Sequence, residues 1–351
     1  MDNLHQPDLS ARTGVARVFA SSGSGIHDGM KAFVTGGGGF LGAALIKNLK
    51  ARGVDVLALA RSQATAVRLE AMGVAAVSGD VTDGDSLRDA MAGADVVYHV
   101  AGVYAVGIKA ADRAPMFRTN VDGTRAVIDA ATAAGVPRTL YVSTVGVFGD
   151  TGGQVVDETY VRPGRDFVSY YDETKFLAHQ LAEDKIAAGA QVVIAQPGAI
   201  YGPGDHSELG AQIEQVRAGK YRVRMFPRLG VTMCHVDDVA EGLVLAAEKG
   251  TVGDAYVLGN DVVRLGDLLD QVSDLTGHPR PRVTLPALAI RAVAPLGPLI
   301  GPLVGVGPDL RETIRASDGV TYWASCDKAR RELGYAPRPL AQGLQDLLAA
   351  G

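Results

Sequence analysis

Residues 31–53 of the chain read KAFVTGGGGFLGAALIKNLKARG, and this stretch decides the fold. Its first five residues form a short apolar, β-branched run, which predicts a buried strand. Its last eleven residues have helical spacing and end at Gly53, a residue type that favours a helix C-terminus. Between them, Gly36, Gly39 and Gly42 form the pattern G-x-x-G-x-x-G. Small residues there let the backbone approach a pyrophosphate, and the helix N-terminus supplies unpaired N–H groups. A glycine-rich turn alone is often only a tight connection, but the flanking strand and helix favour dinucleotide binding.

The same alternation continues along the chain. Further strands are predicted in VDVLALA (54–60), AAVSGDVTD (75–83), ADVVYHVAG (94–102), RTLYVSTVGVFG (138–149) and QVVIAQPGAIYG (191–202). Helical stretches such as 120–135 separate them, so we expect an α/β fold: a Rossmann-type, doubly wound parallel sheet with a smaller C-terminal α/β substrate lobe. The expected division is a flexible tail (1–29), a dinucleotide-binding domain (30–200, completed by 232–262) and a substrate lobe (201–231 and 263–351).

The end of the second strand predicts which dinucleotide binds. An NAD enzyme usually has Asp or Glu there for the ribose 2′-hydroxyl, whereas an NADP enzyme needs a cation for the 2′-phosphate. This chain has Ala60 followed by Arg61 and Ser62. Arginines in loops are commonly only solvated, but the missing acid and the present arginine together favour NADP(H) over NAD(H).

The stretch VSYYDETKFLAHQ (168–180) carries the candidate chemistry. Residues four apart lie on one helix face, so Tyr171 and Lys175 would be neighbours, with Tyr170 pointing elsewhere. An ammonium beside a phenol favours the phenolate and brings its pKa toward the working range of an acid–base catalyst. Thr144 or Ser143, at the end of the predicted strand in 138–149, has the hydroxyl that could donate a hydrogen bond to the substrate oxygen. The alternative is an incidental Tyr/Lys pair on a helix surface, which the dinucleotide turn upstream makes the weaker interpretation.

Composition and charge point to small-molecule ligands. The 351 residues carry a net charge of −5 and no dense basic run, which argues against nucleic acid. The two cysteines, Cys234 and Cys326, have neither a disulfide framework nor zinc spacing, so a reducing cytoplasm fits best. We expect no metal site, because Asp238 and Glu241 near His235 read as a helix cap. The first 29 residues lack the apolar run of a secretory signal, and Met30 is an alternative start that an intact mass would test.

Residues 285–310 form an almost uncharged stretch that could be mistaken for a membrane span. Arg291 and five prolines interrupt it, so we expect no transmembrane segment but short apolar helices that close over a pocket. Simple packing on the sheet and a weak membrane-surface contact are the alternatives. If the stretch lines the pocket, the substrate is lipophilic or aromatic.

Together, the motifs resemble those of the extended short-chain dehydrogenase/reductases from about Met30 to the C-terminus. They are TGxxGFLG (35–42), DV (80–81), HVAG (99–102), NVxGT (120–124), VST (142–144), YxxxK (171–175) and PGxxYGP (197–203). The resemblance implies that Tyr171 is the general acid/base and that Lys175 lowers its pKa and holds the nicotinamide ribose. By the same resemblance, Thr144, with Ser143 as the fallback, orients the substrate. It also implies a homodimer that pairs helices of two subunits.

With the resemblance included, the predicted cofactor contacts extend over every strand end. They are Gly36, Gly39, Phe40, Leu41, Gly42, Arg61, Ser62, Asp80, Val81, Val100, Ala101, Gly102, Asn120, Ser143, Tyr171, Lys175, Pro197, Gly198, Ala199 and Ile200. The predicted substrate contacts are Tyr104, Val145, Tyr201 and His206, of which His206 could equally be solvated surface.

Three functions compete within this family. The first is an NADP-dependent oxidoreductase for a ketone, aldehyde or secondary alcohol, similar to dihydroflavonol reductases and 3β-hydroxysteroid dehydrogenases. The second is an NAD-dependent nucleotide-sugar epimerase or dehydratase, which Arg222, Arg224 and Arg228 keep open as a cluster for an anionic substrate. The third, a dinucleotide-sensing protein without chemistry, is disfavoured by the intact Tyr171 and Lys175.

Departures from the family pattern favour the oxidoreductase. Val231 stands where nucleotide-sugar enzymes commonly carry an arginine for the pyrophosphate. Val145 and Gly146 follow Thr144, whereas sugar dehydratases usually have an acidic pair there. The sequence therefore predicts a reductase or dehydrogenase.

Overall fold

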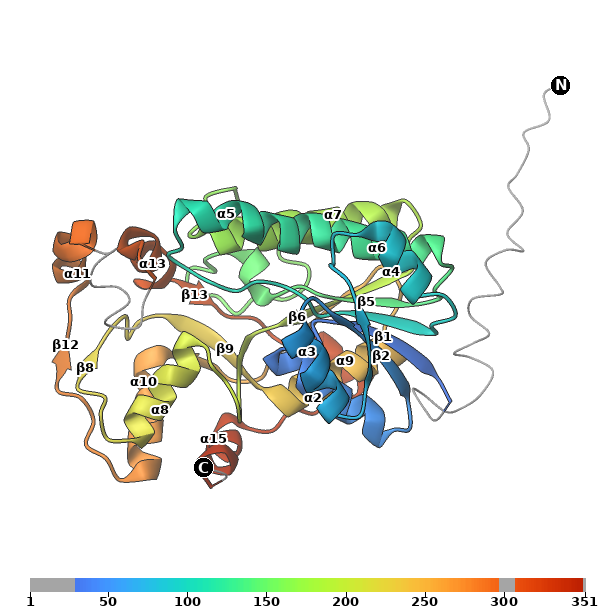
Figure 1. Cartoon of the computed structure of the whole chain (residues 1–351). Coiled ribbons are helices and arrows are strands. Elements are labelled where there is room, and N and C mark those ends of the chain that lie inside the picture. The colour runs from blue at the N-terminus through green and yellow to red at the C-terminus, as the bar shows by residue number, and fades with distance from the viewer. Residues whose placement is uncertain (1–28, 297–306, 350–351) are drawn as a thin grey trace.

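A seven-stranded parallel sheet lies at the centre of the structure, in the order β10-β6-β5-β4-β1-β2-β3 (Figure 1). Its strands are β1 (Lys31–Thr35), β2 (Asp55–Ala60), β3 (Ala75–Ser78), β4 (Val96–His99), β5 (Thr139–Val142), β6 (Val192–Pro197) and β10 (Ala255–Leu258). The direction in which successive strands are added reverses between β1 and β4, which creates the crevice where such sheets bind ligands. The predicted Rossmann-type fold class is confirmed.

The computed structural model describes residues 29–296 and 307–349. The predicted tail therefore lies outside the described residues except for residue 29. The domain boundaries stay a prediction.

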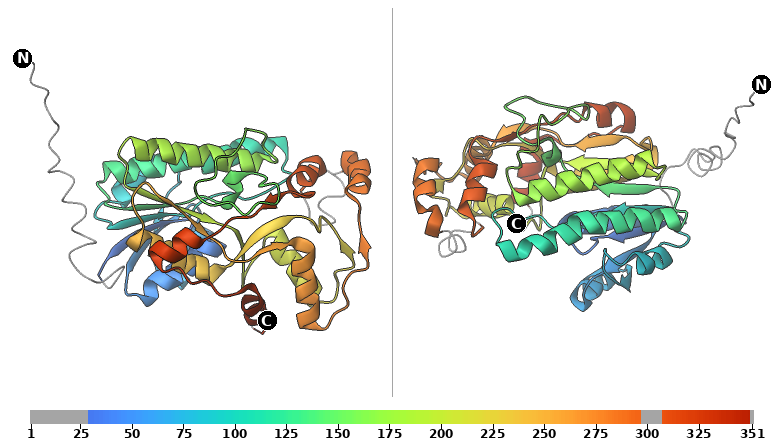
Figure 2. Two further views of the ribbon diagram at one scale, coloured as in Figure 1. Left: turned by 180° about the vertical axis from the view of Figure 1, so that it is seen from behind. Right: turned by 90° about the horizontal axis from the view of Figure 1, so that it is seen from above.

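Helices cover both faces of the sheet (Figures 1 and 2). One face carries α2 (Phe40–Ala51), α3 (Gln63–Ala71), α9 (Val236–Lys249) and α14 (Asp327–Leu333), whose buried side chains share one core with the strands. The other carries α4 (Gly84–Ala90), α5 (Ala110–Phe117), α6 (Gly123–Ala133) and α7 (Tyr170–Ala187). The sheet is thus buried on both sides, which explains why its strands read as continuous apolar runs.

A π-helical segment, η2 (Arg118–Asp122), joins α5 to α6 without a break. Pro115 lies in the turn before it and lacks the N–H that a regular α-helix needs there. Wider turns of this kind often occur at functional sites. Here the segment carries Asn120, which is 2% exposed, toward α7.

The chain leaves the large sheet at Gly198, between β6 and β7 (Ala199–Tyr201). A Cβ at Gly198 would lie 2.1 Å from the carbonyl oxygen of Thr232, so only glycine fits this crossing. Strand β7 pairs with β9 (Gly230–His235), which also pairs with β11 (Val262–Arg264) and β13 (Thr321–Tyr322). Residues 232–262 are expected to complete the dinucleotide-binding domain. Of their strands, only β10 joins the large sheet, because β9 belongs to this second sheet.

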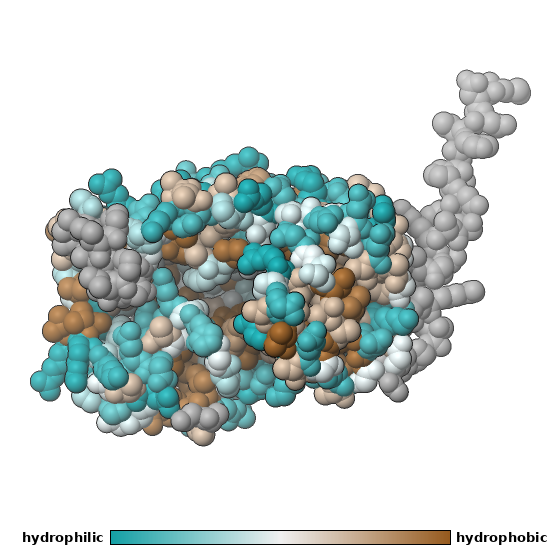
Figure 3. Space-filling model, viewed as in Figure 1, coloured by the Kyte–Doolittle hydropathy of each residue, from teal (hydrophilic) through white to brown (hydrophobic). Residues whose placement is uncertain are grey.

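The remaining elements build the part of the molecule on the left of Figure 1. They are α8 (Glu208–Arg217), β8 (Val223–Arg224), α10 (Leu265–Thr276), β12 (Val283–Thr284), α11 (Ala287–Val293), η4 (Ala294–Leu296), α13 (Leu310–Ser317) and α15 (Leu340–Ala349). Buried side chains of α8, α10 and α15 form a separate hydrophobic core with β7 and β9. The surface is hollowed between this part and the large sheet (Figure 3).

The apolar stretch 285–310 is described only in part. Residues 287–296 form the short helices α11 and η4, as predicted, whereas residues 297–306 lie outside the described residues. Leu288 on α11 is 77% exposed, and apolar atoms gather around β12 at that edge of the surface (Figure 3). Within the described parts of the chain, no helix combines the length and the apolar character needed to cross a bilayer.

Candidate active site

The glycine turn after β1 has no room for side chains. Gly36 has φ +75°, a left-handed conformation, and a Cβ there would lie 2.6 Å from the backbone nitrogen of Ala101. A Cβ at Gly42 would lie 2.1 Å from the carbonyl oxygen of Gly36. These glycines let the first turn of α2 press against the strand ends, as the dinucleotide pattern predicts.

Gly39 serves a different purpose. A Cβ at Gly39, which is exposed, would meet only the Gly36 oxygen, at 3.3 Å. The fold therefore requires glycine less strongly at this position than at Gly36 or Gly42. Gly39 is also the N-cap of α2, and no side chain caps the helix. Phe40 and Leu41 form the first turn. The N–H groups of that turn are therefore available to an anion, which fits the pyrophosphate of a dinucleotide.

The end of β2 places two polar residues beside the glycine turn. Arg61 is exposed and lies close enough to Asp80 to help lower the pKa of that carboxyl, behind hydrogen bonds from the Thr82 side chain and backbone. Ser62 caps α3 by accepting a hydrogen bond from the Thr65 backbone at 3.3 Å. Val81 is buried against Gly123.

Arg68, on α3, is a second cation near the glycine turn, and the sequence alone does not predict its place there. The Arg68 guanidinium would lie 3.7 Å from a Cβ at Gly38, in the turn itself. It also donates to the Thr65 hydroxyl at 3.4 Å. Its sequence signal was weak, because an arginine within a helix is normally a surface residue. Arg61 and Arg68 together give this end of the crevice two cations that could meet a 2′-phosphate.

The end of β4 lies directly opposite the glycine turn. Val100 donates its backbone N–H to the Thr35 carbonyl at 3.3 Å, and Ala101 donates to the Thr35 hydroxyl at 3.2 Å. Gly102 follows on an exposed loop. His99 is buried between the hydroxyls of Thr35 (2.8 Å) and Thr124 (3.1 Å). Burial lowers the pKa of His99 to about 3, so the ring is neutral and structural at physiological pH.

Asn120 makes its hydrogen bonds within the protein. Its amide oxygen accepts from the Val103 backbone at 2.8 Å, and its amide nitrogen donates to the Val103 carbonyl and the Thr174 hydroxyl, both at 3.0 Å. Asn120 thereby ties the loop after β4 to α7. Its predicted contact with the cofactor stays a prediction.

Tyr171 lies in the first turn of α7, opposite Tyr104. The two rings meet edge to face, with centroids 4.8 Å apart. Tyr104 is 60% exposed, so this ring covers the Tyr171 ring from the solvent side. Burial and the neighbouring Tyr104 and Tyr141 raise the pKa of Tyr171, while a hydrogen bond with the Thr144 side chain acts in the opposite direction. The protein's own groups therefore keep the phenol protonated.

Lys175 is a helical turn beyond Tyr171 but faces a different group. Its Nζ donates to the carbonyl oxygen of Val142 at 3.0 Å and lies 5.2 Å from the centroid of the Tyr141 ring. Burial lowers the pKa of Lys175 to about 8. Burial, Tyr104 and Tyr141 raise the pKa of Tyr171, whereas the Lys175 ammonium is expected to lower it, and that lowering stays a prediction.

Ser143 and Thr144 point to different partners at the end of β5. The Ser143 hydroxyl is buried and hydrogen-bonded to Nδ1 of His179 at 2.9 Å. Thr144 is half-buried, and its hydroxyl accepts from the Gly146 backbone at 3.1 Å at the start of η3 (Val145–Phe148). Of the two hydroxyls, that of Thr144 is the one hydrogen-bonded to Tyr171, and its role toward the substrate stays a prediction.

The strand crossing after β6 brings Pro197, Gly198, Ala199 and Ile200 to the same edge of the large sheet. Pro197 is buried, whereas the next three residues are half-buried. Their predicted contact with the nicotinamide is compatible with this placement and stays a prediction.

Two of the four predicted substrate contacts are buried side chains. Tyr201 is 1% exposed and packs edge to face against His235, with centroids 5.4 Å apart. Val145 is 4% exposed and belongs to the main core. His206 is exposed on the loop before α8. The contact of these residues with a substrate stays a prediction.

The expected helix cap near His235 also differs in detail. His235 itself caps α9 by accepting from the Asp237 backbone at 3.3 Å, whereas Asp238 pairs with Arg338 and Glu241 with Arg52. Among the described residues, no group of three His, Cys, Asp or Glu side chains is arranged to hold a metal.

Helix α13 contacts the start of α7 from the far end of the sequence. The Glu312 carboxylate accepts from the Tyr170 backbone N–H at 2.9 Å, and Arg315 donates to the Val168 carbonyl at 3.0 Å. The segment just before Tyr171 is thus held at two points. Nothing in the sequence predicts this contact, because the partners are 142 and 147 positions apart.

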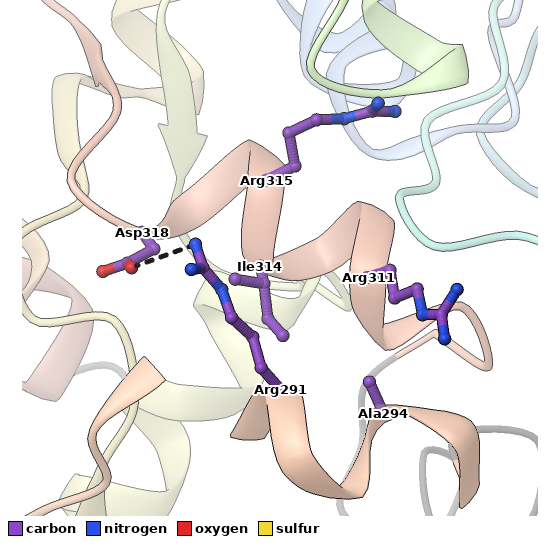
Figure 4. A pocket seen from close by; sticks show the side chains of 6 residues that line it. All are labelled: Arg291, Ala294, Arg311, Ile314, Arg315 and Asp318. Carbon is purple, nitrogen blue, oxygen red and sulfur yellow. Dashed lines mark ion pairs between the residues drawn. The ribbon is translucent and has the colours of Figure 1, made fainter. Parts of the chain in front are cut away.

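A hollow of about 500 Å³ lies on the other side of α13, against α11. Figure 4 shows that its arginines diverge: Arg291 reaches Asp318 at 3.9 Å, whereas Arg311 and Arg315 extend away from that pair. The arrangement does not converge on one anion.

The chain is similar in sequence to known proteins. The sequence pattern of the family described as "NAD dependent epimerase/dehydratase family" matches residues 32–259. A 4-hydroxy-2-methyl-3-oxo-4-farnesyl-3,4-dihydroquinoline-1-oxide ketoreductase from Stigmatella aurantiaca is 36% identical, over 92% of this chain and 97% of the relative. A 2-alkyl-3-oxoalkanoate reductase from Stenotrophomonas maltophilia is 32% identical, over 92% of this chain and 99% of the relative.

Among solved structures, the UDP-glucose 4-epimerase of Thermotoga maritima has a similar fold. The TM-score is 0.74, and the match covers 91% of this chain and 98% of the epimerase. At 20% sequence identity, this likeness concerns the fold alone.

Proposed function

The chain belongs to the NAD dependent epimerase/dehydratase family, and we propose that it is an NADP(H)-dependent oxidoreductase acting on the ketone, aldehyde or secondary alcohol of a lipophilic small molecule. That it is an NAD(P)-dependent oxidoreductase of the extended short-chain dehydrogenase/reductase type follows from the family and from its reductase-named relatives. The choice of cofactor, the substrate class and the catalytic roles are the proposed part.

The observation that carries the proposal is the position of Tyr171. Its ring lies under Tyr104 and beside the Thr144 hydroxyl, at the edge of the sheet where the glycine turn also opens. When bound, the nicotinamide supplies or accepts the hydride. Tyr171 donates its hydroxyl proton to the substrate oxygen as the carbonyl becomes an alcohol, and Thr144 holds that oxygen by a hydrogen bond. The resulting phenolate takes up a proton from solvent.

The raised pKa of Tyr171 suits the direction of reduction. A protonated phenol is the form needed to donate, and the alkoxide that develops from a carbonyl is more basic than a phenolate. Proton transfer from Tyr171 is therefore favourable even though burial makes the phenol a weaker acid.

The glycine turn and its surroundings would hold the cofactor. The α2 N-terminus meets the pyrophosphate, and Arg61 with Arg68 meets the 2′-phosphate. Lys175 meets the nicotinamide ribose. The homodimer and the cytoplasmic location are further parts of the proposal; the two buried free cysteines, Cys234 and Cys326, agree with a reducing compartment.

The lipophilic substrate class is supported by two facts. Both reductase relatives act, by their names, on oxo compounds with a farnesyl or alkyl group. In this chain, Val283, Leu285 and Leu288 expose apolar side chains on the proposed substrate lobe, and the exposed Tyr104 ring lies against Tyr171.

A nucleotide-sugar epimerase is the second candidate, favoured by the fold likeness to the UDP-glucose 4-epimerase. Against it, Val231 replaces the arginine expected in such enzymes. Arg224 and Arg228 are paired with Asp270 and Asp318, which leaves less of the basic cluster for a diphosphate.

Activity assays with a matched pair of variants test the proposal. We expect NADPH-dependent reduction of 2-alkyl-3-oxo acids or bulky aromatic ketones, and loss of kcat by about 10²–10⁴ in Tyr171→Phe with little change in NADPH affinity. Tyr170→Phe, whose ring stacks with Arg113 instead, is the control and should retain activity. Turnover of UDP-glucose alone, or full activity in Tyr171→Phe, would contradict the proposal.

A further inference from the structure

The two-stranded ribbon of β8 and β12 lies at the outer edge of the molecule and exposes apolar side chains (Figure 1). The strands are parallel, and Val283 lies opposite Val223. The pairing continues to Leu285, whose backbone N–H donates to the Arg224 carbonyl at 3.0 Å. Residues two apart on a strand face the same side, so Val283 and Leu285 share one face of the ribbon. Their side chains are 55% and 39% exposed.

Helix α11 extends this apolar face beyond the ribbon. Leu288 is 77% exposed, and Ala292, also exposed, follows one turn later on the same face of the helix. Ile290 and Ala294 face inward and are buried. Apolar side chains therefore gather on the surface over β12 and α11 (Figure 3). We call Val283, Leu285 and Leu288 the apolar edge.

The segments that form this part of the surface are basic, although the whole chain is not. Residues 219–230, around β8, contain four Lys or Arg and no Asp or Glu. Residues 278–296, around β12 and α11, contain three Arg and no Asp or Glu, whereas the complete chain has a net charge of −5. Charges farther away than about 10 Å are largely screened by salt, so this local excess determines what approaches the apolar edge.

Carboxylates of neighbouring elements compensate only part of this positive charge. Four arginines of the two segments reach Asp270, Asp274 or Asp318, namely Arg224, Arg228, Arg280 and Arg291. Asp318 is shared by two of them, Arg228 at 3.0 Å and Arg291 at 3.9 Å. Arg222 and Arg282 are exposed, and neither forms an ion pair within the part of the chain that the structure describes. The surface thus keeps an excess of positive charge.

The ribbon separates its cations from its apolar side chains. Arg222 and Arg282 each come one position before the pair Val223 and Val283, so they lie side by side on the two strands. Alternation along a strand places them on the side opposite to the apolar edge. An element with one apolar and one cationic side is suited to lie in the plane of a bilayer surface, with its cations at the level of the lipid phosphates.

Other occupants fit this surface less well. Arg291 and Arg311, at the hollow between α11 and α13, diverge, which suits many separate headgroups and not one bound anion (Figure 4). A nucleic acid would pair with the arginines but leave Leu288 in water. A symmetric contact with a second copy would bring the arginines of both copies together. Three apolar side chains also cover far less than the roughly 800 Å² per partner that a stable interface buries.

We propose that the apolar edge docks reversibly on the surface of an anionic bilayer. Its side chains enter the boundary between headgroups and acyl chains, while Arg222 and Arg282 pair with lipid phosphates. The small number of inserted side chains makes the contact peripheral and reversible. The proposal depends on this surface alone and does not require the proposed oxidoreductase function. If both hold, docking brings the enzyme to the phase in which a lipophilic substrate dissolves.

Co-sedimentation of the full chain with lipid vesicles tests the docking. We expect binding to vesicles of equal parts phosphatidylcholine and phosphatidylglycerol, and binding about tenfold weaker or more to pure phosphatidylcholine vesicles or at about 0.5 M NaCl. Leu288→Asp should lower the partition coefficient on the anionic vesicles about tenfold or more. Arg222→Ala combined with Arg282→Ala should lower it about 10–30-fold, because each cation near an anionic surface contributes about fivefold.

Two matched controls lie in the loop before α7. Val161→Asp and Arg165→Ala change an exposed apolar side chain and an exposed arginine there, and both variants should bind the anionic vesicles like the wild type. Urea unfolding monitored by circular dichroism checks that every variant is folded, independently of any cofactor.

Three outcomes would overturn the proposal. The first is no binding of the wild type to the anionic vesicles at low salt. The second is equal vesicle binding by Leu288→Asp and Val161→Asp, because loss in the arginine double variant alone would indicate a site for polyanions such as nucleic acid. The third is a dimer in analytical ultracentrifugation that Leu288→Asp dissociates, without vesicle binding by the wild type.

Discussion

The Glu312 carboxylate on α13 accepts a hydrogen bond from the backbone N–H of Tyr170, 2.9 Å away, at the start of the helix that carries Tyr171. Glu312 is 3% exposed, and its other oxygen lies 3.6 Å from Arg113. A carboxylate at a helix N-terminus compensates both a free N–H group and the helix dipole. The position of Tyr171 therefore depends on a residue from the opposite end of the chain.

Replacing this carboxylate should affect stability and turnover together. Glu312→Ala leaves the Tyr170 N–H without its partner, and we expect a loss of about 1–3 kcal/mol in urea unfolding and a lower kcat. Glu312→Gln keeps an oxygen for the N–H and should restore most of kcat. Glu332→Ala, which breaks an exposed pair with Arg331, is the control. Equal kcat in all three variants would show that α13 does not position Tyr171.

The two hydroxyls after β5 should differ in their effect on catalysis. Thr144→Val removes the hydroxyl associated with Tyr171, and we expect kcat to fall by about 10²–10³. Ser143→Ala removes a buried hydrogen bond to His179, so it should cost about 1 kcal/mol of stability and less than about tenfold in kcat. Steady-state kinetics and urea unfolding separate the two effects. The reverse order in kcat would move the substrate-orienting role to Ser143.

Because the pKa of Lys175 is lowered, the free energy of unfolding should depend on pH. The folded protein releases this proton near a pH of about 8, whereas the ordinary value for lysine is 10.5. Between these values the unfolded chain binds more protons, so the free energy of unfolding should rise with pH across this window. Below it, the charged and buried Lys175 costs on the order of 3 kcal/mol.

Lys175→Met tests this directly. The variant should unfold at higher urea concentration than the wild type at pH 7, lose the rise between pH 8 and 10.5, and have lower activity and weaker NADPH binding. Lys185→Met, at a partly exposed position paired with Asp129, is the control. A destabilised Lys175→Met at pH 7 would mean that the ammonium gains more from the Val142 carbonyl than it loses on burial.

Cofactor preference should depend on Arg61 and Arg68. Each single change to alanine is expected to raise the dissociation constant of NADPH by about 10–100-fold and to leave that of NADH almost unchanged. Fluorescence titration with both cofactors gives the ratio. Arg88→Ala, on the exposed face of α4, is the matched control. An unchanged ratio in both variants would remove the argument for NADP(H).

The local part of the fold was predictable because neighbouring residues determine it. The strand, turn and helix of 31–53 appear as β1, the Gly36–Gly42 turn and α2, and the strand ends carry the predicted candidates to one edge of the sheet. A parallel sheet fixes that edge once its strands are recognised.

The candidate residues that the sequence does not show to be buried are those whose burial depends on distant segments. Tyr201 lies near the end of a predicted strand, but β7 turns its ring into the core formed with α15, where Gly343 leaves space for the phenol. Val145 follows Thr144 but packs into the main core. Asn120 fits the family motif, yet the π-helical segment directs its amide to Val103 and Thr174. None of these contacts has a signature in the neighbouring sequence.

The outermost strand of the large sheet, β10, lies late in the sequence, and this order affects how the chain folds during synthesis on the ribosome. The apolar strand β6 is made early, but β10 follows only after the whole insertion of α8, β9 and α9. Until Ala255–Leu258 emerges, the nascent chain exposes an unpaired hydrophobic edge of the kind that templates aggregation. A message truncated before this point would yield a protein that depends on chaperones to remain unaggregated, even though its glycine turn is already complete.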